Sequence, residues 1–320
     1  MTFLTVTPNP SLDRSYAIPH LGRGEVLRSM TDRIDPGGKG VNVSRAVAAH
    51  GARTLAVLPL GGLEGTRLAR LLEERRIAVA GVPVQGPTRV NLALTESDGT
   101  VTKINSMGPE LSLGEARALQ DAVMGHARGV SWIACCGSLP RGLAPDWYAE
   151  LVARARAAKV RIALDTSGPP LRLALAERPD VVKPNVGELS EAVGRPLHTV
   201  GEVVEAAREM REWGAASVLV TLGPDGQLLV DRTGEYFGHA PVDAVVSNVG
   251  AGDASLAGFV LSGGLGQDAL AGALAHGAAA VRLPGSAMPA PSDLFRDAVT
   301  VTSEVPVDHS LSQLVRGAVT

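Results

Sequence analysis

Short apolar segments alternate with longer stretches of helical period along the chain, and this alternation limits the fold more than any other feature. The apolar segments predict strands at 3–7, 54–60, 77–84, 130–136, 160–165, 179–183 and 216–222. The periodic stretches predict helices at 40–51, 64–76, 112–128, 145–158, 186–193, 201–213, 252–262 and 267–282. Parallel strands need long crossover connections, which are usually helices. The sequence therefore predicts an α/β protein with a mostly parallel sheet covered by helices on both faces.

Two segments, at about 12–34 and 88–105, depart from this rhythm. The second, TRVNLALTESDGTVTKIN, alternates apolar and polar residues around Asp98-Gly99, a pair that favours a two-residue hairpin turn. Neither segment has a helix to cover it. We expect the two to form a small β-sheet that stands off the main sheet as a lid. No linker divides the chain, so we expect one domain, residues 1–320, with the lid segments inserted in it.

Composition and charge exclude several classes of function. The net charge is −3 with both signs interspersed, so binding to nucleic acid or to an anionic membrane is not expected. Aromatic residues make up only 3% of the chain, which also argues against a base-stacking surface. The apolar runs are too short to span a bilayer, and the N-terminal residues lack the layout of a signal peptide. We expect a soluble, cytoplasmic protein.

The stretch DPGGKGVN, residues 35–42, is a candidate anion site. Its glycines lead into a predicted helix, whose first amides have no partner inside the helix and carry partial positive charge. Lys39 adds a full charge, and Asn42 adds a donor one turn later. The spacing is not that of a P-loop. Taken alone, the same letters are more typical of a glycine-rich turn with a surface lysine.

Two further stretches place polar residues directly after predicted strands. In NPSLD, Asp13 follows the first strand, where open α/β sheets bind their ligands, although Asp is also a common turn residue. In KPNVGE, Lys183 ends a buried strand, and Asn185 and Glu188 follow three residues apart on one helix face. Such a pair can reach a metal–phosphate cluster. It is also the pattern of a helix cap with Glu at its third position.

The stretch SNVGAGD, residues 247–253, leads small residues into an acid at a predicted helix start. The amides around Gly250, Ala251 and Gly252 could stabilise charge that develops on a transferred phosphoryl group. Asp253 could then take a proton from the attacking hydroxyl, or it could simply cap the helix. A helix N-terminus is expected to lower the pKa of Asp253 below its ordinary value near 3.9.

These stretches occur together and in one order. NPSLD, GGKGVN, GSLP, KPNVGE, VTLGPDG and VGAGD resemble the ribokinase-like (PfkB) sugar kinases from Pro8 to about Pro291. Within that family, RGEV, PGGKGVNV, TRVNLALTESDGTVT and CGSLPRG resemble bacterial 1-phosphofructokinases. The stretch NSMGPELS is closer to the tagatose-6-phosphate kinases.

The resemblance implies a three-layer α/β/α fold with a mostly parallel central sheet and a small β-sheet lid. It implies ATP with Mg²⁺ as phosphoryl donor and a hexose phosphate as acceptor, with fructose 1-phosphate giving fructose 1,6-bisphosphate. Tagatose 6-phosphate and fructose 6-phosphate remain alternative acceptors. A non-catalytic regulator that binds a sugar phosphate or a nucleotide is the alternative outside enzymes. Uncovered lid edges favour a homodimer through the lid.

The resemblance also implies a role for each candidate residue. The base would be Asp253, beside the amides at Gly250, Ala251 and Gly252. Acceptor contacts would come from Asp13, Gly37, Gly38, Lys39, Asn42, Arg89 and Ser138, with Lys39, Arg89 and Ser138 at the existing phosphate. The nucleotide would be bound by Lys183, Asn185, Glu188, Thr221, Gly223, Gly226 and His276. Asn185 and Glu188 would hold the metal, through water.

Overall fold

The chain is described by a computed structural model that covers residues 1–312, and a ten-stranded sheet forms its centre. The order across this sheet is β14-β13-β12-β11-β10-β9-β8-β1-β4-β5. Its strands are β1 (Thr2–Val6), β4 (Arg53–Leu60), β5 (Ala78–Pro83), β8 (Trp132–Cys136), β9 (Arg161–Asp165), β10 (Val181–Val182), β11 (Ser217–Thr221), β12 (Gln227–Asp231), β13 (Gly234–His239) and β14 (Thr300–Thr302). In this order, the seven neighbouring strands β11, β10, β9, β8, β1, β4 and β5 are parallel to one another. The remaining strands β12, β13 and β14 each pair antiparallel with their neighbours.

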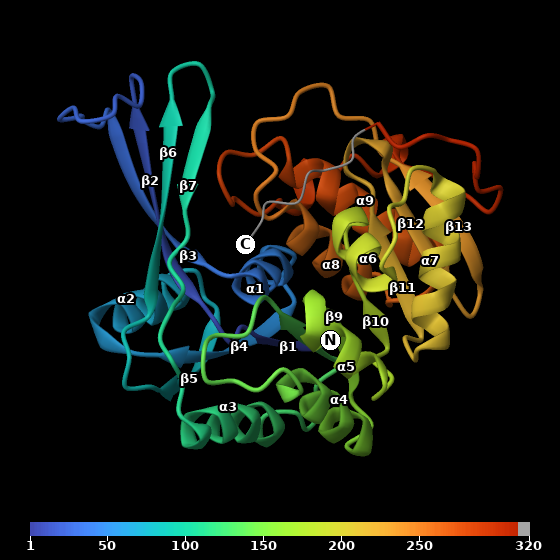
Figure 1. Ribbon diagram of the computed structural model, residues 1–320, viewed down its shortest axis with the longest axis horizontal. Helices are drawn as coiled ribbons and strands as arrows, with labels where there is room; N and C mark the ends of the chain where they lie inside the picture. Colours follow the sequence, from blue (N-terminus) through green and yellow to red (C-terminus); the bar gives the residue numbers. More distant parts are fainter. Residues whose placement is uncertain (313–320) are drawn as a thin grey trace.

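Within residues 1–312, nine α-helices accompany the strands, and Figure 1 shows them around the sheet. They are α1 (Lys39–Ala49), α2 (Gly62–Glu73), α3 (Leu113–Gly125), α4 (Trp147–Ala157), α5 (Gly168–Leu175), α6 (Val186–Val193), α7 (Val200–Glu212), α8 (Ala251–Leu261) and α9 (Gly266–Ala280). Buried side chains of α3 to α7 pack in one cluster, and those of α1, α8 and α9 pack in another. Within residues 1–312, no helix is both long enough and apolar enough to cross a bilayer.

The central strands are apolar on both faces, because each face is covered by one helical layer. In β8, Ile133 and Cys135 point into the first cluster, while Trp132, Ala134 and Cys136 point into the second. This alternation confirms the three-layer α/β/α arrangement that the resemblance implies.

A second sheet of four strands, in the order β3-β2-β6-β7, stands off the main sheet. Its strands are β2 (Ser11–Ile18), β3 (Thr31–Gly37), β6 (Arg89–Glu96) and β7 (Val101–Ile104), and in Figure 1 they rise at the upper left, apart from α8 and α9. The turn between β6 and β7 differs from the expected two-residue turn. Glu96 N donates to Thr100 O, and Gly99 adopts a positive φ of 89°. The loop therefore has three residues and closes with a glycine bulge.

The segment after β14 runs back along the start of α7. Gly201 N donates to Val307 O at 2.9 Å, and Leu311 N donates to His198 O at 2.9 Å. At its end, Ser312 donates to the buried carboxylate of Asp225 through its backbone N, at 2.8 Å, and through its hydroxyl. His309 Nε2 lies 3.3 Å from the same carboxylate. The segment thus anchors the loop that joins β11 to β12.

Candidate active site

Asp165 is the centre of the polar cluster at the carboxyl edge of the main sheet. It is the last residue of β9, and its side chain is only 1% exposed. Lys39 Nζ, from the first residue of α1, donates to Asp165 Oδ1 at 2.8 Å. Lys183 Nζ, one residue after β10, forms an ion pair with Asp165 Oδ2 at 3.0 Å. A buried carboxylate is tolerated when charged partners surround it in this way.

The two ammonium groups keep Asp165 ionised. Burial alone would raise the pKa of Asp165, but Lys183 and Lys39 outweigh burial and lower that pKa to about 2. In return, the carboxylate of Asp165 raises the pKa of Lys39 well above its ordinary value, and Glu188 adds to the effect. Both lysines therefore carry a positive charge at neutral pH, next to a single fully buried anion.

Asn185 and Glu188 open α6 with reciprocal hydrogen bonds. Glu188 N donates to Asn185 Oδ1 at 2.8 Å, and Asn185 N donates to Glu188 Oε2 at 2.9 Å. The capping interpretation of KPNVGE is therefore correct as local structure. The cap also orients the acid, because Glu188 Oε1 lies 3.5 Å from Lys39 Nζ.

Asp253 lies in the first turn of α8, and it is 6% exposed. Asn42 Nδ2, from α1, donates to Asp253 Oδ2 at 2.8 Å. The carboxylate caps no amide, since the N-cap position of α8 is Gly250, which has a positive φ of 80°. The first hydrogen bond inside the helix runs from Ala254 N to Gly250 O, so the amides of Gly252 and Asp253 precede it.

Lys183 lies close both to Asp165 and to the amides at the start of α8. A Cβ atom placed on Gly252 would lie 3.2 Å from Lys183 Nζ, so the ammonium group is in contact with the start of α8. The ammonium group of Lys183 therefore lies close to the first turn of α8, which carries the Asp253 carboxylate. That combination suits an anion whose charge grows during a reaction.

The pKa of Asp253 differs from the value expected from its place at a helix start. Burial and the nearby Asp165 carboxylate raise the pKa of Asp253 to about 6, against the opposing effects of Lys39, Asn42 and Lys183. The expectation of a lowered pKa was wrong. The helix end acts on a group that is almost completely removed from water, and the sequence does not show the second carboxylate beside it.

Asp13 lies at the base of the lid, against the glycine turn. Asp13 Oδ1 accepts hydrogen bonds from Ser11 Oγ at 2.7 Å and from Asn91 Nδ2 at 3.0 Å. A Cβ atom on Gly37 would collide with the Asp13 carboxylate, so a larger residue there would displace that side chain. Gly38 follows as the N-cap of α1, with a positive φ of 117°.

Arg89 is held beside this group by backbone oxygens. Its Nη2 donates to Asn9 O at 2.9 Å, and its Nη1 donates to Ser106 O at 3.0 Å. Its Nε is buried without a hydrogen-bond partner among residues 1–312. Arg89 of β6 is paired in register with Ser11 of β2, and Asp13 follows Ser11 by two residues. The side chains of Arg89 and Asp13 therefore lie on the same face of the lid.

The remaining candidates are more scattered. Thr221 N donates to Pro184 O at 3.1 Å, which places the loop carrying Gly223 and Gly226 beside Asn185. Ser138 is exposed after β8. His276 is 1% exposed, bonds Gly272 O through Nδ1 at 2.7 Å and packs against the ring of His50. The structure does not bring His276 into the Asp165 cluster.

Sequence reasoning missed Asp165 itself. It ends a strand that the sequence predicted at 160–165, so an acid at the carboxyl end of a buried strand was the available signal. A single Asp without a spacing motif is too common to stand out. Its importance becomes visible only when Lys39 and Lys183 are found on either side of it.

Comparison with known proteins identifies related sequences and structures. A sequence model of the family described as pfkB family carbohydrate kinase matches residues 11–293. The 1-phosphofructokinase of Rhodobacter capsulatus is 40% identical over 271 residues, which are 82% of this chain and 84% of that protein. Phosphofructokinase-2 from Escherichia coli, solved in complex with potassium, has a TM-score of 0.86 and 32% identity over 91% of this chain and 96% of that chain.

Two other solved structures add to this comparison. A further structure of the Escherichia coli phosphofructokinase-2 is described as its tetrameric inhibited form, and its TM-score is 0.81 at 32% identity over 89% of this chain and 95% of that chain. Ribokinase from Arabidopsis thaliana, complexed with ribose and ATP, has a TM-score of 0.72 at 23% identity over 91% of this chain and 96% of that chain. At that identity, the ribokinase likeness supports the fold alone.

We predict that Asp165→Asn lowers the free energy of unfolding by about 3–5 kcal/mol, because it leaves two positive side chains without their buried partner. Asp121→Asn is the matched control, since Asp121 forms an exposed ion pair with Arg154. Losing that exposed pair should cost at most about 1 kcal/mol. Urea denaturation measures both values. Equal losses in the two variants would show that Asp165 does not hold the cluster together.

Proposed function

This chain belongs to the pfkB family of carbohydrate kinases, and we propose that it transfers the γ-phosphoryl group of ATP to the C6 hydroxyl of fructose 1-phosphate. The products would be ADP and fructose 1,6-bisphosphate. The observation that carries the proposal is the buried Asp253 carboxylate, held by Asn42 beside the amides that open α8 and the ammonium group of Lys183. We also propose that the reaction takes place in the cytoplasm, where ATP and sugar phosphates are found.

Asp253 suits the role of the base. Asn42 occupies Oδ2, which leaves Oδ1 to orient the acceptor hydroxyl and to receive its proton. A pKa of about 6 is closer to neutral pH than that of an ordinary aspartate, which makes the ionised form a better proton acceptor. In a loose phosphoryl-transfer transition state the hydroxyl loses its proton late, so a moderate base is sufficient.

The surrounding charges would stabilise the transferred group. As the acceptor oxygen bonds to the γ-phosphorus, the bond from that phosphorus to the β,γ-bridging oxygen breaks and ADP leaves with the electron pair. The amides of Gly252 and Asp253 and the ammonium of Lys183 would face this charge. Lys39 Nζ lies beside Asp165 and Glu188, and this position supports the proposal that Lys39 contacts the transferred phosphoryl group, as an alternative to the phosphate already on the acceptor.

The residues at the start of α6 fit Mg²⁺. Glu188 offers a half-buried carboxylate and Asn185 an amide oxygen, and such oxygen donors suit an ion that commonly takes one or two carboxylates together with substrate phosphates. We propose that these two residues hold the ion through water. Bound there, Mg²⁺ would neutralise charge on the ATP phosphates. The loop with Thr221, Gly223 and Gly226 adjoins them and would contact the nucleotide.

The acceptor would lie between the lid and the glycine turn. Asp13 and Asn42 would bind sugar hydroxyls, and Arg89 would bind the existing phosphate through its buried, unpartnered Nε. Ser138 remains a proposed second phosphate contact, and it is exposed at the end of β8 as that role requires. His276 remains an untested proposal for the adenine pocket, and its burial against His50 gives that proposal no support.

We expect the highest kcat/KM with fructose 1-phosphate when the purified protein is given ATP, Mg²⁺ and a series of acceptors. The series includes tagatose 6-phosphate, fructose 6-phosphate and unphosphorylated fructose, and ADP release is the measurement. A higher kcat/KM for one of the 6-phosphates would transfer the assignment to that kinase. No ADP release with any hexose phosphate would favour a non-catalytic regulator.

We predict that Asp253→Asn lowers kcat by about 10²–10⁴-fold, because it removes the base. The folded protein should not become less stable at pH 7, since the raised pKa of Asp253 means that its ionised form disfavours the native state above the ordinary pKa. Thermal unfolding checks this second point.

The wild-type pH profile is the companion measurement to Asp253→Asn. The value of kcat/KM should rise through about pH 6 as Asp253 loses its proton, and Asp253→Asn should lack that limb. Near-normal turnover in the variant would contradict the assignment of the base.

We propose that the lid pairs two subunits. Apolar side chains are exposed on the lid and its connecting loop at Leu21, Val26, Met30, Val101 and Ile104. Light scattering should give a dimer mass for the wild type and a monomer mass for Ile104→Lys, because a buried charge would disfavour the apolar contact. Leu63→Lys, at an exposed apolar position on α2, should remain dimeric. A monomeric wild type would refute the lid dimer.

A further inference from the structure

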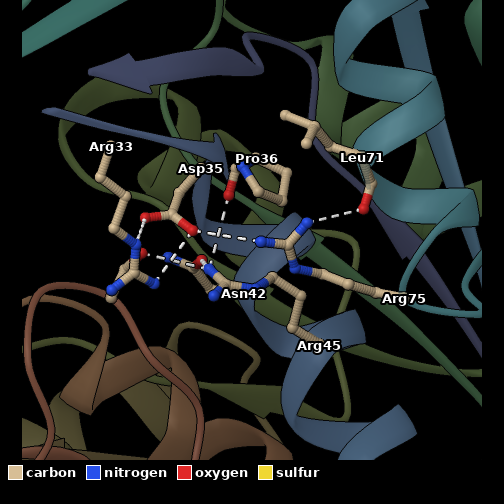
Figure 2. Close-up of polar contacts among 8 residues, drawn as sticks. Arg33, Asp35, Pro36, Asn42, Arg45, Leu71 and Arg75 are labelled. Carbon is tan, nitrogen blue, oxygen red and sulfur yellow. Dashed lines mark hydrogen bonds and ion pairs between the residues drawn. The ribbon is translucent and has the colours of Figure 1, made fainter. Parts of the chain in front are cut away.

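Arg45 is a buried cation at one side of the Asp253 site. It lies on α1 three residues after Asn42, on the same helix face, and is 8% exposed. Its Nη1 donates to Asn42 Oδ1 at 3.0 Å, to Ser286 Oγ at 3.1 Å and to Pro36 O at 3.5 Å, and Figure 2 shows the contacts to Asn42 and Pro36. Burial lowers the pKa of Arg45 to about 10, so the side chain is still charged at neutral pH.

The contact with Arg45 determines which way the Asn42 amide points. The two ends of an Asn amide have nearly the same shape but opposite hydrogen-bonding character. Asn42 Oδ1 accepts from the guanidinium, and Asn42 Nδ2 donates to Asp253 Oδ2 at 2.8 Å. In the flipped amide, the oxygen would face the carboxylate and the NH₂ group would face the guanidinium, so both contacts would become repulsive.

We propose that Arg45 is a positioning residue for phosphoryl transfer, which holds the Asn42 amide so that it donates to Asp253. The proposal rests on the proposed function in one respect, namely that Asp253 is the base. Arg45 reaches the base only through Asn42. The groups that face Asp253 from the elements packed against it are Asp165 of β9, Lys39 and Asn42 of α1, and Lys183 after β10.

The neighbouring arginines provide an internal control. Arg33 and Arg75 both bind the Asp35 carboxylate, and Arg75 also donates to Leu71 O at 2.8 Å, as Figure 2 shows. Among residues 1–312, neither of these two arginines hydrogen-bonds to Asn42. Arg75 therefore shares the cluster and the charge of Arg45, although it is more exposed, and it does not contact the amide that orients the base.

The first experiment compares Arg45→Met, Arg45→Lys and Arg75→Met. A hydrogen bond to a charged group is worth enough to change a rate by about tenfold or more, so kcat should fall by that factor in Arg45→Met while the KM for ATP stays close to the wild-type value. The acid limb of kcat/KM should move from about pH 6 to higher pH by about one unit. Arg45→Lys, which retains a donor, should recover part of both effects, and Arg75→Met should show neither.

A double-mutant cycle separates positioning from a direct effect of charge. If Arg45 acts through Asn42, then Arg45→Met should cause no further loss of kcat and no further shift of the acid limb in a protein that already carries Asn42→Ala. Effects that simply add would overturn the proposal, because Arg45 would then act on Asp253 without the amide. An unshifted acid limb in Arg45→Met would overturn it as well.

A titration without substrates keeps this test independent of activity. The Asp253 carboxyl carbon is followed by NMR in the ligand-free protein, and its signal is assigned by its loss in Asp253→Asn. Arg45→Met should raise the pH midpoint of the Asp253 titration by about one unit. Urea denaturation checks that the variant is folded. An inactive wild type with this shift would refute the proposed function while still supporting the inference that Arg45 orients the Asn42 amide toward Asp253. A midpoint that stays at its wild-type value would refute that role.

Discussion

The site depends on one buried carboxylate with two ammonium partners. Asp165 draws Lys39 from the start of α1 and Lys183 from the end of β10 to within 2.8 and 3.0 Å. Because Lys39 is fixed there, Glu188 has a cation to face, and because Asp165 is ionised, it raises the pKa of the nearby Asp253. The start of α1 is thereby joined by charge to β9 and β10, which are distant from it in sequence, at the edge where parallel strands end.

The same buried setting explains why two acids in one site behave differently. Asp165 has a cation on each carboxylate oxygen, and its pKa falls to about 2. Asp253 is equally removed from water but is held by a neutral amide, and its pKa rises to about 6. One acid is thus a permanent anion, while the other can exchange a proton near neutral pH. Environments that separate two pKa values in this way are typical of acid–base sites.

Much of the fold could be predicted because it rests on periodicity, which each segment carries by itself. The eight expected helices are present within a few residues of their predicted bounds. α5 was missed because it is short and its first turn contains Gly168 and two prolines, residues that are tolerated in a first turn but usually break a helix. The glycine turn, KPNVGE and SNVGAGD led to Lys39, Glu188 and Asp253 because their letters keep a fixed spacing. Asp165 and the direction of the Asp253 pKa shift depend on which segments meet in space, and no local pattern contains that information.

The contact between Ser312 and Asp225 has a consequence for synthesis on the ribosome. The two residues are 87 positions apart, and the serine is made last. At a translation rate of roughly 5–20 residues per second, the loop between β11 and β12 exists for on the order of ten seconds before its anchor has been made. Throughout that interval a carboxylate destined for burial must stay hydrated. A nascent chain therefore carries this loop without its anchor until the segment after β14 has been made.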